Sequence, residues 1–363
     1  MKRSSTLAWR WARLRAMGPA EIIQRATWEM TKAVWRARAG WQSPPMVWAG
    51  VQQRPPLPAL PEEAVSDLLR DALRVLNGEY LFLGQRLPPG STDWHRDPFT
   101  GVVAPSGFGP DIDCRDPALV GDARTLWELN RLQHTGLMAA AYAVSGDARL
   151  AEAVERDLSS WLESNPFPCG PNWYSSLEAA LRLIAMADIQ RLMPEAPSTD
   201  RLFGRQGSAW ASIYHHQMFI AAHWARGSSA NNHLIGEAAG LLVASTAWPY
   251  WRESAKWRDV ARSIIEREAV RQLFPDGLDR EQAFGYHLFV AELFVAAGVA
   301  AERAGQPLSE RFKGTVRAMV EAVPRLTDVG GNVPRWGDSD DGRAYRLGPD
   351  GDRIASLYHV ARG

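Results

Sequence analysis

The chain has 363 residues, and 46% of them are hydrophobic, which is enough to build a large buried core in one or two domains. Lys plus Arg and Asp plus Glu both number 41, so no net charge draws the protein to nucleic acid. No nucleic-acid partner is therefore expected, and an acidic substrate would have to be held by local groups.

Neither a metal nor a cofactor is expected. Cys114 and Cys169 lie far apart, without CxxC spacing or flanking histidines, which argues against a zinc cluster and a disulfide scaffold. The acidic stretch 337–343 lacks the ligand spacing and the distal Glu of an EF-hand, so a turn is the favoured interpretation.

The first 40 residues carry nine Lys or Arg against two Glu, with four tryptophans among them, which predicts a basic amphipathic helix pair. Either this arm binds a membrane surface or a partner, or its aromatics pack on the main domain while the arginines face water; we favour packing. Arg10, Arg13 and Arg15 interrupt the apolar core that a signal peptide needs, so no export signal is visible. The tryptophans are Trp9, Trp11, Trp28 and Trp35.

Six prolines between Ser43 and Pro61 predict an extended connector, so residues 1–61 form an arm and linker. A helix pattern follows from Glu62 to Asn77, and residues 81–116 read as a long ordered loop. No apolar run approaches the ~20 residues that span a bilayer, so no transmembrane segment is expected.

The remaining chain predicts a series of helices with Leu, Ala and Val at helical spacing. Short breaks make consecutive helices antiparallel neighbours, and no exact repeat indicates a regular solenoid. The predicted architecture is all-α: a ring of antiparallel helical hairpins over residues 62–327, followed by a turn-rich tail, 328–363, at a domain boundary. The expected helices are 120–145, 148–163, 175–193, 205–224, 231–246, 253–272, 281–304 and 309–326.

Polar residues gather just before the apolar helix that begins near Leu234. Residues 228–233 read SSANNH, and a helix N-terminus presents free N–H groups and partial positive charge that suit a carboxylate. Ser and Asn are also the preferred ordinary caps, and spacing alone slightly favours capping.

A second polar cluster spans residues 276–287 and reads as a turn followed by a helix. The first turns of this helix carry Glu281, Gln282, Tyr286 and His287, and Gln282 and Tyr286 form an i, i+4 pair. A lone helical tyrosine is more often a packing residue than a catalytic one, so these residues alone do not establish catalysis.

Three segments, SSANNHLIGEAAGLL, DGLDREQAFGYHLFVAELF and NVPRWGDSDDGR, resemble in order and spacing the heparinase II/III-like lyases and the related alginate lyases. Two upstream segments, DARTLWELNRLQHTGLMAAAYAVSGD and NPFPCGPNWYSSLEAALRLIAMAD, also resemble this family. The resemblance covers roughly residues 8–350. Its upstream matching positions are Trp127, Glu128, Asn130, Arg131, Trp173, Ser176, Glu178 and Arg182.

The resemblance implies that residues 62–327 form an incomplete (α/α) toroid, which in this family is usually followed by a β-sandwich. It also implies cleavage of uronic-acid-containing polysaccharides (glycosaminoglycan, alginate or exopolysaccharide) by β-elimination. Asn232 matches the Asn that neutralises the uronate, and Tyr286 matches the Tyr that serves as acid or base. His233 matches a carboxylate-binding or proton-transfer position of related alginate lyases.

The other candidate residues follow from the two clusters and from the same resemblance. A phenol with a pKa of about 10 needs cationic or hydrogen-bonding neighbours to act as a base at neutral pH. His233, His287, Arg226 and Arg182 could supply them. The expected substrate-binding residues are Asn231, Trp127, Glu128, Asn130, Arg131, Trp173, Arg182, Arg226, Gln282 and His287.

The chain departs from the family pattern because members commonly draw another catalytic His from the β-sandwich, which is expected to be absent here. His359 matches no catalytic motif, so the chain could need a partner or a further domain. Family resemblance implies the periplasm or cell envelope, whereas the lack of a visible signal peptide leaves the cytoplasm open.

Three other functions remain open. The first is a glycan-binding toroid without turnover, and the second is a purely structural helical-repeat protein. The third is a glycoside hydrolase on a similar toroid, which needs two carboxylates about 5 to 10 Å apart. The candidates for that pair are Asp276, Asp279, Glu281, Asp338 and Asp340.

Overall fold

The computed structural model describes residues 18–38, 40–48, 60–82, 85–87, 93–227, 230–329, 332–338 and 342–345. Almost all regular structure in these ranges is helical, and the strands are a two-residue pair, β1 (Leu81–Phe82) and β2 (Gln85–Arg86). The predicted all-α architecture is confirmed. The helices are α2 (Pro19–Ala37), α3 (Glu62–Leu76), η1 (Gly109–Asp111), α4 (Pro117–Val120), α5 (Ala123–Asn130), α6 (Gln133–Ser145), α7 (Ala148–Ser164), η2 (Pro171–Trp173), α8 (Ser176–Leu192), α9 (Pro197–Phe203), α10 (Trp210–Ala222), α11 (Asn232–Ala247), α12 (Ser254–Arg271), α13 (Phe284–Arg303) and α14 (Glu310–Leu326).

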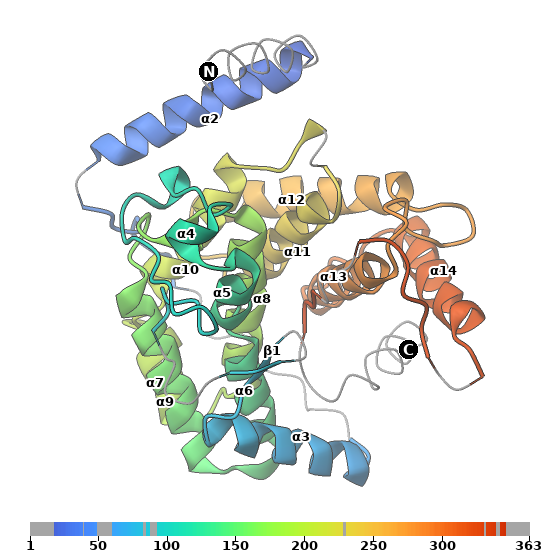
Figure 1. The fold of residues 1–363 in the computed structure, drawn as a ribbon, viewed down its shortest axis with the longest axis horizontal. Coiled ribbons are helices and arrows are strands. Elements are labelled where there is room, and N and C mark those ends of the chain that lie inside the picture. The colour runs from blue at the N-terminus through green and yellow to red at the C-terminus, as the bar shows by residue number, and fades with distance from the viewer. Residues whose placement is uncertain are drawn as a thin grey trace.

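Helices α6 to α14 follow an arc around the body of the protein (Figure 1). Helix α11 lies in the middle and packs against α8, α12 and α13, while α6 packs against α3, α7 and α8. The approach of α11 to α8 is close, because a Cβ on Gly240 would lie 2.5 Å from the Cβ of Ala180. Because Gly236 also lies against Leu177, the N-terminal ends of α8 and α11 are neighbours, and the first polar cluster lies beside the start of α8.

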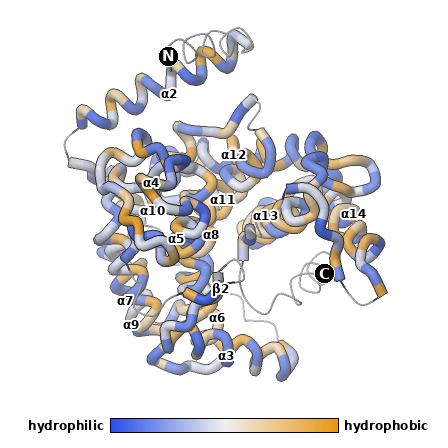
Figure 2. Tube along the Cα trace, in the orientation of Figure 1, coloured by the Kyte–Doolittle hydropathy of each residue, from blue (hydrophilic) through white to orange (hydrophobic). Residues whose placement is uncertain are grey.

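Helices α8, α11 and α13 are apolar around much of their circumference because they are buried between other helices. Figure 2 shows the hydrophobic colouring of this part of the chain. Helix α13 is long and apolar enough to cross a bilayer, with a mean hydropathy of 1.6, so the expectation that no segment approaches that length is wrong. Because 67% of its apolar window is buried, α13 is a core helix of this fold.

Most helix boundaries agree with the expected ones within two residues, but three segments differ, one of them the helix expected at 281–304, which begins at Phe284. The expected helix 120–145 is divided into α4, α5 and α6, and Leu132, between α5 and α6, has a left-handed φ of 61°. The expected helix 205–224 begins only at Trp210, and the preceding short helix α9 was not expected. A left-handed turn at a leucine is uncommon and has no signature in the hydrophobic pattern.

The N-terminal arm packs on the main body through its aromatic side chains, as favoured from the sequence. Trp28 stacks on His223 with 4.0 Å between ring centroids, and Trp35 meets Phe167 edge to face at 5.2 Å. Gln24 adds a hydrogen bond of 2.9 Å from Nε2 to the carbonyl of Trp224. Trp9, Trp11 and most of the linker lie outside the described residues.

Residues 342–345 of the tail return to the helical body and connect its first and last hairpins. The backbone N–H of Ala344 donates to Glu292 on α13 at 2.7 Å, and Gln133 at the start of α6 donates from Nε2 to the carbonyl of Arg343 at 2.5 Å. His359 and Asp340 lie outside the described residues, and the domain limits stay predictions.

Candidate functional site

The start of α11 and the turn before α13 are joined by one carboxylate. Glu281 accepts hydrogen bonds from the backbone N–H of Asn232 at 2.7 Å and from its Nδ2 at 2.9 Å. Asn231 caps the helix, because its Oδ1 accepts from the backbone N–H of His233 at 3.2 Å. The two polar clusters of the sequence therefore meet, and the capping interpretation holds for Asn231.

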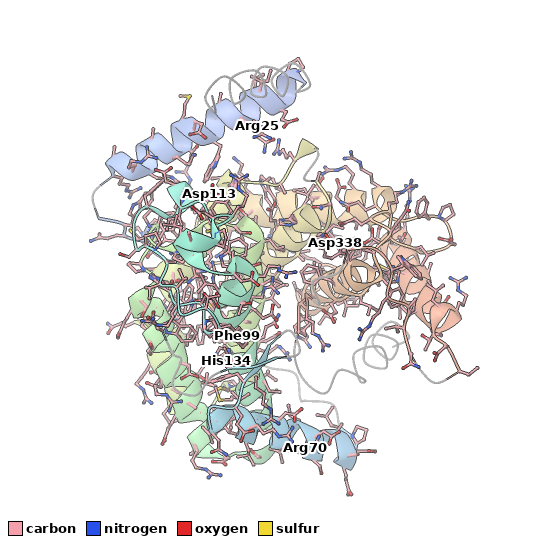
Figure 3. All side chains as sticks on the ribbon, viewed as in Figure 1. Arg25, Arg70, Phe99, Asp113, His134 and Asp338 are labelled. Atoms are coloured by element: carbon pink, nitrogen blue, oxygen red, sulfur yellow. The ribbon has the colours of Figure 1, made fainter. Side chains whose placement is uncertain are left out.

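The turn that carries Glu281 is held from both sides. Asp279 accepts the backbone N–H of Glu281 at 3.0 Å, and Gln282 has a left-handed φ of 57°. A Cβ on Gly337 would lie 2.5 Å from the carbonyl oxygen of Gln282, so the backbone at Gly337 packs closely on this turn. The neighbouring Asp338 is labelled in Figure 3. Gln282 precedes α13 instead of forming a helical pair with Tyr286, which corrects the expected start of that helix at residue 281.

Leu132 and Gln282 are the two non-glycine residues with positive φ in the described part of the chain. Leu132 directly follows Arg131, and Gln282 directly follows Glu281. Such backbone conformations cost free energy and gather at functional sites more often than elsewhere. Their positions are consistent with a site built around these two charged groups.

His287 supports the turn from inside the protein. Its Nδ1 accepts from the backbone N–H of Asp279 at 3.3 Å, its Nε2 donates to the carbonyl of Met319 at 3.0 Å, and only 2% of the residue is exposed. Burial lowers the pKa of His287 to about 4, and burial raises the pKa of Asp279 to about 6. Both ring nitrogens of His287 are engaged internally, so its assignment as a substrate contact stays a prediction without support from this geometry.

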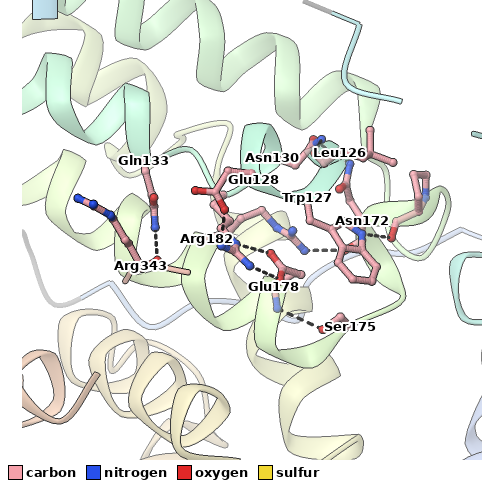
Figure 4. A network of polar contacts seen from close by, with 12 residues as sticks. Leu126, Trp127, Glu128, Asn130, Gln133, Asn172, Ser175, Glu178, Arg182 and Arg343 are labelled. Atoms are coloured by element: carbon pink, nitrogen blue, oxygen red, sulfur yellow. Dashed lines mark hydrogen bonds and ion pairs between the residues drawn. The ribbon is translucent and has the colours of Figure 1, made fainter. Parts of the chain in front are cut away.

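A buried ion-pair network lies beside the start of α11 (Figure 4). Arg131 donates to both carboxylate oxygens of Glu178 at 2.8 Å and to Glu128 at 2.5 Å. Burial acts to raise the pKa of Glu178, but the guanidinium of Arg131 outweighs it and the pKa lies below its usual value. His233 contributes to this lowering, so its side chain lies within electrostatic range of Glu178.

Arg182 lies deeper in the same network and is fully buried. Its Nε donates to Nε2 of His216 at 2.9 Å and its Nη2 to the carbonyl of Asn172 at 2.6 Å. The guanidinium also lies over the ring of Trp161, 5.0 Å from its centroid. Arg182 therefore has no exposed surface in this structure, and its assignment as a substrate-binding residue stays a prediction without support from its placement.

Asn130 and Trp173 are likewise fully buried, which corrects their expected role in binding substrate. Asn130 accepts from Nε1 of Trp161 at 2.8 Å and from Nδ2 of Asn172 at 2.8 Å. Trp173 donates from Nε1 to the carbonyl of Asn165 at 3.2 Å. Both residues satisfy buried polar groups below the site, as buried groups require.

The remaining candidates reach the surface to different degrees. His233, Gln282 and Arg226 are exposed, Asn231 and Tyr286 are half-buried, and Asn232 is 4% exposed. Trp127 is half-buried and stacks on Tyr174, with 5.9 Å between ring centroids and 17° between the planes. Glu128 and Arg131 are buried and brace the start of α8.

Two residues that the sequence interpretation missed have defined contacts here. Glu281 was considered only as a hydrolase carboxylate, although it orders both asparagines, and His216 was not considered although it pairs with Arg182. A sequence signal existed for Glu281, since an acidic side chain in a turn can satisfy the free N–H groups of another helix. In the described ranges, no group of three or more His, Cys, Asp or Glu is placed to hold a metal ion.

We expect the free energy of unfolding to fall as the pH drops from about 6.5 to 4, because the buried histidines with lowered pKa values outnumber the buried carboxyls with raised pKa values, such as Glu237 at about 8 and Asp279 at about 6. Burial lowers the pKa of four histidines to about 4, below the value of about 6.5 in an unfolded chain, so the unfolded state binds more protons in this range. Chemical denaturation at stepped pH measures the loss, and His287→Gln should reduce its slope. A constant free energy between pH 7 and 4.5 would contradict this. The histidines are His134, His215, His223 and His287.

The sequence of this chain is similar to those of known proteins. A family model described as Heparinase II/III N-terminus matches residues 84–350. The heparin-sulfate lyase of Pedobacter heparinus is 25% identical over 227 residues, which are 61% of this chain and 34% of that protein. The heparin-sulfate lyase of Bacteroides thetaiotaomicron is 27% identical over 206 residues, or 55% of this chain and 29% of that protein. The matches thus span about a third of the length of these relatives.

Two solved structures share the fold. The crystal structure of heparan sulfate lyase HepC from Pedobacter heparinus has a TM-score of 0.52 at 21% identity and covers 88% of this chain and 46% of that one. A crystal structure of heparinase III has a TM-score of 0.53 at 19% identity and covers 83% of this chain and 43% of that one. The predicted incomplete (α/α) toroid is confirmed by this likeness.

Proposed function

Because the chain belongs to the Heparinase II/III N-terminus family, we propose that it acts as a polysaccharide lyase that cleaves a uronic-acid-containing glycosaminoglycan by β-elimination. The observation that carries this proposal is the junction at Glu281, which lies five residues before Tyr286 in the chain and binds Asn232 at the start of α11. The names of the matched relatives, heparin-sulfate lyases, support heparan sulfate as the first substrate to test.

The reaction explains why an amide and a phenol are needed. Removal of the proton on C5 of a uronate places negative charge next to a carboxylate that is already negative. Hydrogen-bond donors directed at the carboxylate stabilise this charge. The bond between C4 and the glycosidic oxygen then breaks, the oxygen takes up a proton, and a C4–C5 double bond remains in the product.

Asn232 is the proposed donor to the uronate carboxylate. One N–H of its Nδ2 is held by Glu281, which leaves the direction of the second N–H fixed because the amide is planar. The exposed His233 follows Asn232 directly, whereas the first two N–H groups of α11 are already bound, to Glu281 and to Oδ1 of Asn231. The 4% exposure of Asn232 means that substrate has to approach over His233 and the turn at Gln282.

Tyr286 is the proposed acid and base. It lies in the first turn of α13 and is half-buried, so its hydroxyl can meet both solvent and a bound sugar. Exposed His233 and Arg226 are the cationic groups that would lower the barrier to forming a phenolate, whereas buried Arg182 and His287 are not available for that role. The assignments of Tyr286 and Asn232 rest on the family match and on this placement.

The test is the ultraviolet absorbance of the unsaturated uronide, measured with heparan sulfate, alginate and an acidic exopolysaccharide. Product from heparan sulfate supports the proposal, and product from alginate alone would replace the substrate class. New reducing ends without any unsaturated uronide would indicate hydrolysis, but Asp279 and Glu281 are engaged in internal hydrogen bonds, which disfavours them as a hydrolytic pair. Location in the cell envelope stays a prediction.

We expect Glu281→Gln to lower kcat about 10- to 100-fold with a smaller effect on KM, because reacting groups displaced by about 1 Å lose catalysis on this scale. The glutamine keeps one oxygen acceptor, but its amide nitrogen cannot accept from Nδ2 of Asn232. Steady-state kinetics on heparan sulfate measure the effect. Glu310→Gln, at a highly exposed carboxylate, is the matched control. Equal kinetics for the two variants would exclude a positioning role for Glu281.

A further inference from the structure

Helix α2 has a second apolar face that nothing in the described structure covers. One side of the helix is anchored to the body by Gln24, Trp28 and Trp35. On the opposite side Ile23, Met30 and Val34 are 67%, 71% and 65% exposed. These values are high for large apolar side chains on an ordered helix, and α2 crosses the outside of the body (Figure 1).

The exposed apolar residues form a continuous stripe along α2. They follow the spacing i, i+3, i+4, i+7, i+10, i+11 and i+14, which places them on one face of a helix. Charged residues flank the stripe but do not interrupt it, and Arg25 (Figure 3) pairs with Glu21 at 2.8 Å. The stripe runs for about 20 Å at 1.5 Å per residue. Its members are Ile23, Ala26, Thr27, Met30, Ala33, Val34 and Ala37, all exposed.

The charge of the chain is segregated around the same segment. The first 40 residues carry nine Lys or Arg and two Glu, a net charge of +7, and residues 1–17 contain no acidic residue. Since the whole chain balances 41 basic against 41 acidic residues, the remaining 323 residues carry a net −7. The chain is therefore neutral overall, although its first 40 residues are basic and the remainder is acidic.

We propose that α2 binds the surface of an anionic lipid bilayer, with the stripe from Ile23 to Ala37 inserted at the boundary between headgroups and acyl chains. An amphipathic helix that combines an apolar face with flanking basic residues binds membranes in this way. Basic residues close to an anionic lipid surface strengthen such binding. A soluble polyanion would match the positive charge but would leave the apolar stripe in water, so the lipid surface is the better fit.

The position of α2 also determines on which side of the candidate site a bound bilayer would lie. The inner face of α2 packs on the loop that precedes α11: Trp28 stacks on His223, and a Cβ on Gly227 would lie 3.2 Å from the carboxylate of Glu21. A bilayer bound to the outer face of α2 would therefore lie on the side of that helix away from this loop. The inference does not depend on the proposed lyase activity.

The test is sedimentation of the full chain with phosphatidylcholine vesicles, with and without 30% phosphatidylglycerol. Wild-type protein should bind the anionic vesicles at least tenfold more strongly than the neutral ones, and binding should weaken in high salt. The triple variant Ile23→Asp, Met30→Asp, Val34→Asp should lose at least tenfold in binding. The matched control is Leu73→Asp, Leu119→Asp, Val260→Asp, which adds the same charge at exposed apolar positions of other helices and should bind nearly as wild type.

Insertion of the stripe has its own readout. With both native cysteines replaced by serine, a polarity-sensitive dye on Met30→Cys should shift to the blue with anionic vesicles, and the same dye on Leu73→Cys should not. No binding by the wild type, or equal binding by the two triple variants, would overturn the proposal. A concentration-dependent dimer that the α2 triple variant alone abolishes, without vesicle binding, would assign the stripe to a second copy of the chain instead.

Discussion

Tyr286→Phe is expected to lower the rate of unsaturated-product formation by at least 100-fold while the fold is retained. A positioned acid or base contributes about 10²- to 10⁴-fold, and phenylalanine removes only the hydroxyl. The half-buried position of Tyr286 at the start of α13 allows the ring to keep its packing. The rate is measured by ultraviolet absorbance with heparan sulfate at saturating concentration.

The matched control is Tyr142→Phe, which removes the hydroxyl of another half-buried tyrosine, on α6. It should leave the rate within about twofold of the wild type, because α6 does not carry either polar cluster. If both variants retain full activity, Tyr286 is not the acid or base, although the protein could still be a lyase. If only Tyr286→Phe loses activity while its binding of heparan sulfate is unchanged, the role proposed for the hydroxyl is supported.

Arg131→Met is expected to lower the free energy of unfolding by about 3 to 5 kcal/mol, which is the usual cost of removing one partner of a buried ion pair. Glu178 and Glu128 would remain buried with 3% and 2% of their side chains exposed and without the cation that binds them. Chemical denaturation at pH 7 measures the loss. Stability of the variant should recover partly as the pH falls, since protonation neutralises the stranded carboxylates.

Arg149→Met provides the comparison, because Arg149 pairs with Asp147 at 2.6 Å while 69% of its side chain is exposed. An exposed pair of this kind contributes about 0 to 1 kcal/mol. A loss below 1 kcal/mol for Arg131→Met would show that solvent reaches the network, and the buried ion pairs would then not be the support of the site. We expect Arg131→Met to lose more stability than Arg149→Met, and we expect part of that loss to be recovered as the pH falls.

Much of the helical framework could be predicted because capping and periodicity are local properties. The start of α11 at Asn232 and the start of α14 at Glu310 each follow a residue whose side chain accepts a helical N–H, Asn231 and Ser309. The break at Leu132 could not be predicted, because a left-handed leucine is stabilised by its tertiary surroundings and has no local signal.

The individual residues of the candidate site were harder to predict than the segments that carry it. Asn232, His233 and Tyr286 were expected to meet, and the hydrogen bonds of Asn232 to Glu281 do join the two segments. Arg182 and His287, in contrast, were expected at the substrate but are buried. Helices α8 and α13 are apolar around much of their circumference, so their sequences do not indicate which polar residue faces solvent and which faces a neighbouring helix.

The sequence by itself determined the helical class, the order of the hairpins and the two polar segments, since each depends on residues close together in the chain. Only the tertiary structure decided that Glu281 joins the asparagines to the turn before α13, that Arg131 lies between two glutamates, and that no described part of the chain covers one face of α2. These features depend on which helices pack together, and long-range packing is set by the summed burial of many side chains rather than by any local pattern.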